Sequence, residues 1–248
     1  MNKTPRTLLS SVYPGKRDQI MSLFVIGDTH LSLGCKKPMD VFGGRWENYV
    51  EKLSAGFSRV GPEDVTVLCG DLSWGMSLEE AREDFLFLHR LPGKKLIVKG
   101  NHDYWWTTVA KARRFFAENG IDSLDFLHNN CHIYGDAALC GTRGWFYEEE
   151  RGEQHDRKIL DREKQRLETS LRAAGDREKL VFLHYPPKLV NYECSELIDL
   201  MCAYGVHRCW YGHLHSAGRR AAFEGTYREI RFRLISADHL SFIPEKIL

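Results

Sequence analysis

The chain alternates short apolar runs with longer stretches whose hydrophobic positions have helical spacing. The apolar runs predict strands at residues 23–26, 65–69, 96–98, 137–140, 180–183 and 208–211. Apolar residues that recur every three or four positions predict helices at residues 45–60, 78–91, 107–119 and 156–174. Gly120 and Gly175 stand where the last two helices should end. Strands that alternate with helices predict an α/β fold, and residues 219–243 are predicted to be mostly strand.

The length of the chain suits one globular domain. It has 248 residues, of which 43% are hydrophobic, enough for a substantial core. No internal repeat or linker interrupts residues 21–248, which we expect to form a single domain. Residues 1–20 are polar and rich in turn formers, such as Pro14 and Gly15. We expect them to be either a loosely attached leader, with Met21 as the natural start, or an ordinary N-terminal arm.

Charge and cysteine content narrow the class of protein. The formal net charge is +1, which does not favour a dedicated nucleic-acid binder. No run of about 18 apolar residues predicts a membrane span, and residues 1–20 lack the apolar centre of a secretory signal. The seven cysteines include no CxxC pair, so neither a disulfide framework nor a zinc ribbon is expected. A reducing, cytoplasmic location is the natural expectation.

Polar side chains follow five of the predicted strands directly. They are Asp28 and His30, Asp71, the stretch Asn101-His102-Asp103, His184, and the pair His213 and His215. In α/β sheets, ligands bind beyond the carboxyl ends of the strands, so these residues are expected to converge. One such residue alone would be an ordinary loop or packing residue. All five groups together, each after an apolar strand, are hard to explain by packing.

These residue types share a chemical purpose. Carboxylate, imidazole and amide oxygen together suit borderline divalent cations such as manganese, iron or zinc. In extended backbone, residues i and i+2 point to the same side, so Asp28 with His30, and His213 with His215, can each aim two ligands into one cavity. The sequence therefore predicts a metal centre at the carboxyl edge of the sheet.

The ordered motifs resemble the calcineurin-like metallophosphoesterase superfamily. Its pattern is D-x-H, G-D, G-N-H-[DE], a single His and G-H-x-H, and this chain carries each part in that order from residue 28 to residue 215. The chain is most similar to the small bacterial-type predicted phosphohydrolases of the superfamily. The resemblance implies a four-layer αββα sandwich with two mixed sheets, and a phosphoesterase that hydrolyses a phosphate monoester or diester.

The resemblance also implies a role for each residue. It assigns Asp28, His30 and His215 to a first divalent metal ion, Asn101, His184 and His213 to a second, and Asp71 to a bridge between them. A hydroxide held by both ions would attack phosphorus without a covalent enzyme intermediate. His102 would stabilise the developing charge and protonate the leaving group. We expect Asp103 to orient His102.

One stretch departs from the pattern of the superfamily's protein phosphatases, which continue G-D as G-D-x-x-D-R. Here Trp74 replaces the Asp that supports the catalytic His, and Gly75 replaces the Arg that grips phosphate. Protein phosphatase activity is therefore disfavoured. Arg143, in a Gly-flanked turn, is a candidate replacement for the phosphate grip, or else a surface arginine.

Tryptophans cluster near the same motifs, and they suggest a kind of substrate. Trp74, Trp105, Trp106 and Trp145 each lie within a few residues of a strand end. They are either core residues or an aromatic wall, with Trp74 as the candidate to stack on the substrate. The expected partner is a small phosphorylated molecule, with a nucleotide as one candidate.

Two rival functions remain open from sequence. A DNA nuclease of the same superfamily would use the same metal site, but it usually carries an added capping domain. A non-catalytic scaffold would have lost metal ligands, whereas every ligand position is filled here. The substrate, the native metal and the oligomeric state cannot be read from the sequence.

Overall fold

Two β-sheets face one another in the computed structural model, which describes residues 21–145 and 153–248. The expectation for residues 1–20 falls outside these ranges. The first sheet contains, in spatial order, β13 (Glu245–Lys246), β1 (Leu23–Ile26), β2 (Val65–Cys69), β3 (Lys94–Val98) and β4 (Leu124–Phe126). Strands β1 to β4 are parallel, and β13 pairs with β1 antiparallel.

The second sheet has the same plan, with parallel strands in the centre and antiparallel strands at its edges. In spatial order it contains β11 (Gly225–Tyr227), β12 (Ile230–Leu234), β10 (Arg208–Tyr211), β7 (Glu178–Leu183), β6 (Ala137–Thr142) and β5 (Cys131–Tyr134). Strands β12, β10, β7 and β6 are parallel, whereas β11 and β5 are antiparallel to their neighbours. Both sheets are therefore mixed, as predicted.

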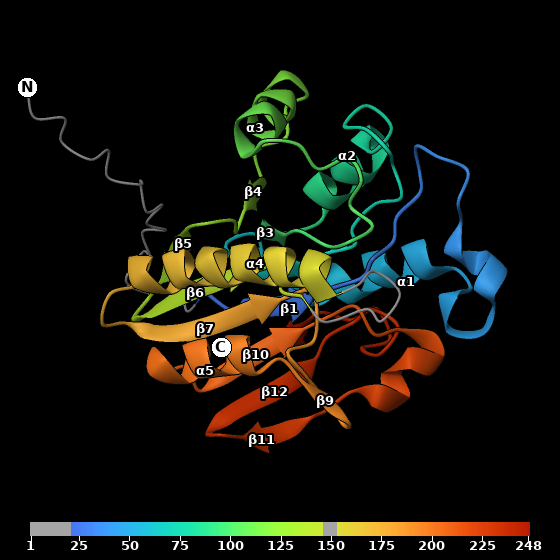
Figure 1. Ribbon diagram of the computed structural model, residues 1–248. Coiled ribbons are helices and arrows are strands. Elements are labelled where there is room, and N and C mark those ends of the chain that lie inside the picture. The colour runs from blue at the N-terminus through green and yellow to red at the C-terminus, as the bar shows by residue number, and fades with distance from the viewer. Residues whose placement is uncertain (1–20, 146–152) are drawn as a thin grey trace, which may run out of the picture.

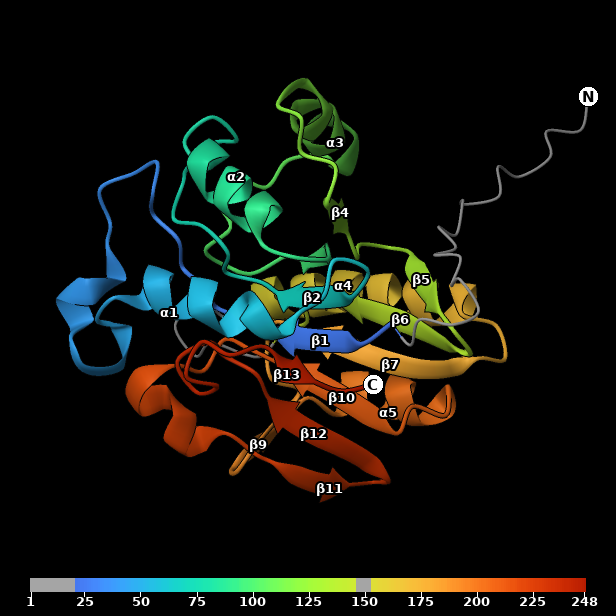
Figure 2. The ribbon, with the colours of Figure 1, turned by 180° about the vertical axis from the view of Figure 1, so that it is seen from behind.

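Helices cover the outer face of each sheet (Figure 1, Figure 2). On the first sheet lie α1 (Tyr49–Gly56), α2 (Arg82–Arg90) and α3 (Val109–Glu118). On the second lie α4 (Glu153–Ala173) and α5 (Ser195–Ala203). Short 3₁₀ helices span Met39–Phe42, Gly44–Trp46, Phe57–Arg59 and Ser216–Ala221, and β8 (Lys188–Leu189) pairs with β9 (Tyr192–Glu193). The layers are helix, sheet, sheet and helix, which confirms the predicted αββα sandwich.

Apolar side chains on both faces of the strands explain the layered arrangement. Along β1, Leu23 and Val25 pack into the core between the sheets, whereas Phe24 and Ile26 pack beneath the helices of the first sheet. Strands that are buried on both faces read as continuous apolar runs, which is why the strand predictions held.

The structure corrects several of the predicted elements. The helix expected over residues 45–60 is only eight residues long, with 3₁₀ turns before and after it. The helix expected over residues 78–91 begins at Arg82. Residues 219–243 begin in a 3₁₀ helix and end in turns, with only β11 and β12 between them. Strands β4 and β5 and helix α5 were not predicted. No helix in the described ranges is long and apolar enough to cross a membrane.

Candidate metal centre and active site

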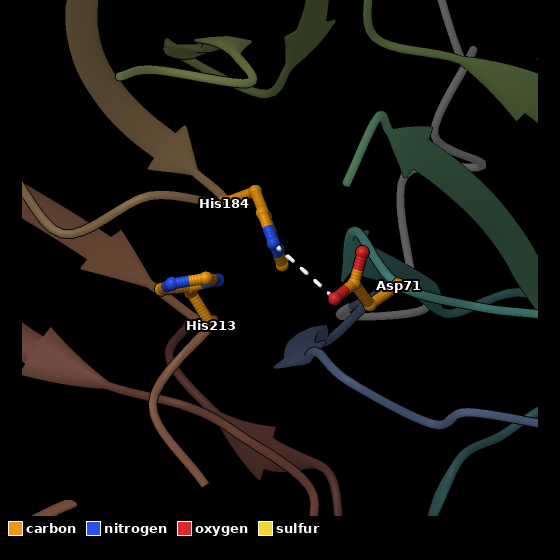
Figure 3. A group of neighbouring side chains, drawn as sticks. All are labelled: Asp71, His184 and His213. Carbon is orange, nitrogen blue, oxygen red and sulfur yellow. Dashed lines mark ion pairs between the residues drawn. The ribbon is translucent and has the colours of Figure 1, made fainter. Parts of the chain in front are cut away.

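The predicted ligands all emerge at the carboxyl ends of central strands. Asp28 and His30 follow β1, Asp71 follows β2 and Asn101 follows β3, all from the first sheet. His184 follows β7, and His213 and His215 follow β10, from the second sheet. Figure 3 shows Asp71 facing His184, with His213 beside them. The seven side chains therefore come together across the two sheets.

The backbone turns sharply where the ligands leave their strands. Asp28, His30, Asp71 and His213 have positive φ angles of 55°, 45°, 52° and 71°. Non-glycine residues seldom adopt this conformation, and backbone strain of this kind concentrates at functional sites. The neighbouring Gly100 is required for another reason: a Cβ there would collide with the backbone nitrogen and the Oδ1 of Asp71. The loops after β2 and β3 approach closely because Gly100 has no side chain.

The potential metal ligands form two overlapping clusters. Asp28, His30 and Asp71 have ligand atoms within 4.8 Å of one another, and so have Asp71, His184 and His213. Asp71 belongs to both: its Oδ2 lies 3.8 Å from His30 Nε2 and 3.5 Å from His184 Nε2. This is the position that a bridging carboxylate would occupy.

Two further predicted ligands lie at the edges of these clusters. The Oδ1 of Asn101 is 2.7 Å from His184 Nε2 and 3.0 Å from His213 Nδ1, which places the amide with the second cluster. The ring of His215 lies 5.1 Å from that of His30, beside the first cluster. Asn101 therefore lies beside His184 and His213, and His215 lies beside His30.

Several buried polar atoms in the centre have no hydrogen-bond partner. They are both ring nitrogens of His30 and the Oδ2 of Asp71. Buried polar groups are almost always hydrogen-bonded, so His30 Nε2 and Asp71 Oδ2, which lie 3.8 Å apart without a partner among the described residues, require an explanation. A divalent cation supplies it, because imidazole nitrogen and carboxylate oxygen are its ordinary ligands. The residues present fit divalent metal ions.

The protonation states of the ligands also suit metal binding. Burial lowers the pKa of His184 to about 3 and that of His213 to about 2, so both rings are neutral at physiological pH. His184 donates its Nδ1–H to the carbonyl of Cys69 at 3.0 Å, which leaves the lone pair of Nε2 facing Asp71 and Asn101. Burial raises the pKa of Asp71 to about 6, and burial with the charge of Asp71 raises that of Asp28. Cations in the site would favour the ionised carboxylates.

His102 stands beside the ligand clusters and outside them. Its backbone N–H donates to Asp71 Oδ1 at 2.7 Å, while its half-buried ring packs against Trp74, with centroids 4.6 Å apart. The hydroxyl of Tyr104 lies 3.4 Å from Nδ1 of the ring. The ring is therefore near the metal ligands and remains accessible to a substrate.

Asp103 binds the loops of the site. Its carboxylate accepts hydrogen bonds from the backbone N–H groups of Gly100, Asp71 and Leu72, and from the indole of Trp105, at 2.7–3.0 Å. These bonds lead away from the imidazole of His102. Asp103 therefore positions the 71–72 and 100–103 loops, and through the second of them the backbone of His102.

Trp74 occupies the space between two histidines of the site. Its ring stacks on His30, with centroids 5.0 Å apart and planes at 22°, and it also contacts His102. It lines a cavity of about 340 Å³ together with residues 36–39, 41 and 42. By contrast, Trp105 and Trp145 are buried, and Trp106 packs on Phe126. Among the four tryptophans singled out from sequence, Trp74 has the contacts expected of an active-site wall.

Arg143 lies between the metal centre and helix α4. Its Nη2 is 3.5 Å from Glu163 Oε1, its guanidinium lies 4.9 Å from the ring of Trp145, and its buried Nε has no hydrogen-bond partner. The backbone carbonyl of Arg143 accepts the N–H groups of His184 and Tyr185 at 3.1 Å and 2.8 Å, which holds Arg143 beside the second cluster.

Some residues of the site were missed from sequence. Tyr104 contacts His102, and Asp238 accepts the backbone N–H of Ser216 at 2.8 Å and acts electrostatically on His215. Asp238 follows β12, so it carried the same strand-end signal as the ligands. The alternating arginines of that strand, Arg231 and Arg233, hid its apolar pattern.

Comparison with known proteins identifies the family. Residues 21–217 match the family model of the calcineurin-like phosphoesterases. The chain belongs to this family and is a metallophosphoesterase, a hydrolase. No curated protein matches it.

Two solved structures have the same fold. One is a phosphopantetheinyl hydrolase from Mycobacterium tuberculosis, at 14% identity and a TM-score of 0.59, covering 92% of this chain and 95% of that one. The other is a protein of unknown function from Aquifex aeolicus, at 15% identity and a TM-score of 0.51, covering 91% and 95%. At these identities the likeness shows the fold alone.

Proposed function

We propose that this protein hydrolyses a small phosphate monoester or diester with two divalent metal ions. The observation that carries the proposal is the pair of ligand clusters that share Asp71. The unpaired Nε2 of His30 and Oδ2 of Asp71 support it, since they lie 3.8 Å apart and both residues belong to the first cluster. Asp28, His30 and His215 would hold one ion, Asn101, His184 and His213 the other, and Asp71 both.

The bound ions would supply two effects: they would polarise the phosphoryl oxygens and lower the pKa of the attacking water. The chain's own residues would orient the reacting groups and protonate the leaving group. Asp71 accepts the backbone N–H of His102 and so fixes this residue next to the centre. The protonated imidazole of His102, whose pKa burial lowers and the charge of Asp71 raises, would give its proton to the oxygen of the leaving group. Asp103 is the positioning residue that holds both loops in this arrangement.

Trp74 and Arg143 would determine how the substrate lies. Trp74 contacts His102 and lines the neighbouring cavity, so the leaving group would lie against its ring. Arg143 is joined to His184 through its backbone carbonyl and its side chain is partly exposed, so its guanidinium would bind a phosphate oxygen.

The first test compares para-nitrophenyl phosphate with bis-para-nitrophenyl phosphate, each with manganese and with a chelator. We expect turnover that depends on manganese. Hydrolysis of the diester would identify a phosphodiesterase, and nucleotide and phosphopantetheinyl diesters would be tested next. Hydrolysis of the monoester alone would identify a phosphatase. If neither ester were hydrolysed by protein shown to contain metal, the proposal in this form would be wrong.

A further inference from the structure

Three cationic side chains gather on one side of the metal centre. They are Lys99, directly after β3, Arg143, directly after β6, and Arg166 on α4, and we call them the basic flank. Arg143 and Arg166 both contact Glu163, with Nη atoms 3.5 Å and 2.5 Å from its Oε1. The charges of Arg143 and Arg166 lower the pKa of Lys99, after the larger effect of burial. Arg143 and Arg166 therefore share one carboxylate, and Lys99 lies within the electrostatic reach of both.

The topology explains why the basic flank adjoins the metal centre. The ligands follow β1, β2 and β3 in one sheet, and β10 and β7 in the other. The next strands outward are β4 and β6, and His128 follows β4 as Arg143 follows β6. Helix α4 packs on this part of the second sheet (Figure 1). The flank thus continues the carboxyl edge on which the metal centre lies.

Among the residues that the structure describes, positive charge exceeds negative charge within the flank. Glu163 is buried and already engaged, because it also accepts the hydroxyl of Thr142 at 2.5 Å. Asp103, the other carboxylate that acts on Lys99, is occupied by four hydrogen-bond donors. His128 is neutral at physiological pH, since burial and the charge of Arg166 lower its pKa to about 4. Two occupied carboxylates thus face three cations.

The side chains of the flank also retain binding capacity. The buried Nε–H of Arg143 has no acceptor. Lys99 places its ammonium 5.9 Å from the ring centroid of Trp106, and within the described ranges it has no carboxylate partner. Arg143 links the flank to the metal centre, because its backbone carbonyl accepts the N–H of His184 at 3.1 Å while its guanidinium reaches Glu163. A single anionic molecule can therefore reach both places.

We propose that the basic flank is a second anion subsite, and that the substrate is a phosphoester with another phosphate or similarly anionic group near the scissile one. This rests on the proposed function, since the scissile phosphate would lie in the metal centre. Arg143 would contact the substrate between its two anionic groups, whereas Lys99 and Arg166 would bind the second group. Bisphosphates and diphosphate esters are the class that this arrangement selects.

The test uses two ligands that differ only in the second anion and cannot be hydrolysed: propylphosphonate and propane-1,3-diyl bisphosphonate. Their affinities for the manganese-loaded protein are measured by calorimetry. Because charge-assisted contacts to phosphonate are strong, we expect the bisphosphonate to bind at least about tenfold more tightly. In Lys99→Met and in Arg166→Gln, this preference should fall to within about threefold.

Lys111→Met is the matched control, since Lys111 is an exposed lysine on α3, outside the flank. It should keep the full preference, and thermal melting checks that all variants are folded. Equal binding of the two ligands to the natural chain would overturn the subsite, and so would a preference that survives both flank substitutions. If the preference follows the flank but no phosphoester is hydrolysed, the proposed function fails and the subsite stands.

Discussion

Asp71 belongs to both ligand clusters, and its two carboxylate oxygens have different partners. Oδ1 accepts the backbone N–H of His102, and Oδ2 faces the imidazoles of His30 and His184. In Asp71→Asn, the amide oxygen can keep the first contact, but an NH₂ group that cannot bind a cation replaces Oδ2. We expect manganese affinity, measured by calorimetry, to fall at least about tenfold at both sites together. Unchanged affinity would show that Asp71 is not a ligand.

His102→Ala should reduce turnover and leave manganese binding nearly unchanged. The imidazole lies outside both ligand clusters, so manganese affinity should stay within about twofold, whereas kcat should fall about 10²- to 10⁴-fold through loss of the proton donor. Calorimetry and steady-state kinetics on one preparation measure both quantities. A loss of metal in this variant would make His102 a ligand and would refute its assigned role.

At the scale of single residues, the sequence predicted which side chains converge but not which neighbouring residues hold them in place. The ligands could be predicted because each directly follows an apolar strand. Glu163 and Tyr104 could not, since one lies within a highly charged helix and the other in a loop. The bonds of Asp103 depend on how the loops after β2 and β3 approach, which no spacing in the sequence records.

Among the elements, central strands were predicted well and peripheral ones poorly. Strands β1 and β2 are buried on both faces, so their apolar runs are uninterrupted. Strand β4 has only three residues, with half-buried Asp125 in the middle. The apolar positions of residues 45–60 form one continuous helical pattern. In the structure, tertiary packing replaces both ends of the expected helix by 3₁₀ turns, and α1 is the part between them. The hydrophobic pattern thus predicts an element reliably where the faces of that element are fully buried.

Strand β3 also contains an ionisable side chain that is fully buried. Lys95 donates to the backbone carbonyls of Leu91 and Gly93 at 2.6 Å and 2.8 Å, and burial lowers its pKa from 10.5 to about 7. Between these two pKa values the unfolded chain holds more protons than the folded one. The contribution of Lys95 to the free energy of unfolding should therefore rise as pH increases above 7.

Comparison with Lys95→Met isolates this contribution, because the other titrating groups cancel. The lost contacts to the carbonyls lower the stability of the variant by an amount that does not depend on pH. The free energy of unfolding of the natural chain minus that of the variant should increase by up to about 1.4 kcal/mol per pH unit between pH 7 and 9. Urea unfolding at each pH measures this difference. A constant difference would mean that the carbonyls keep Lys95 protonated.

For the whole molecule, the α/β class followed from the alternation of elements, and the two-sheet architecture followed from the resemblance. The alternation did not reveal which sheet each strand would join. Strands β1, β2 and β3 lie in one sheet, and β7 and β10 in the other. The chain leaves the first sheet after β4, forms the second between β5 and β12, and returns to the first with β13. The metal centre therefore joins two sheets rather than lying on one.

This placement predicts that metal ions stabilise the fold. Four of the candidate ligands come from the first sheet and three from the second, so two bound metal ions would connect the two halves of the sandwich. An ion that binds only the folded state stabilises it by about 2.7 kcal/mol at 100 times its dissociation constant. We expect the melting temperature, measured by calorimetry, to rise with manganese concentration and to fall with a chelator. Asp71→Asn should lose most of this rise, whereas Lys111→Met should keep it. A melting temperature that does not change with manganese in the natural chain would refute the connection.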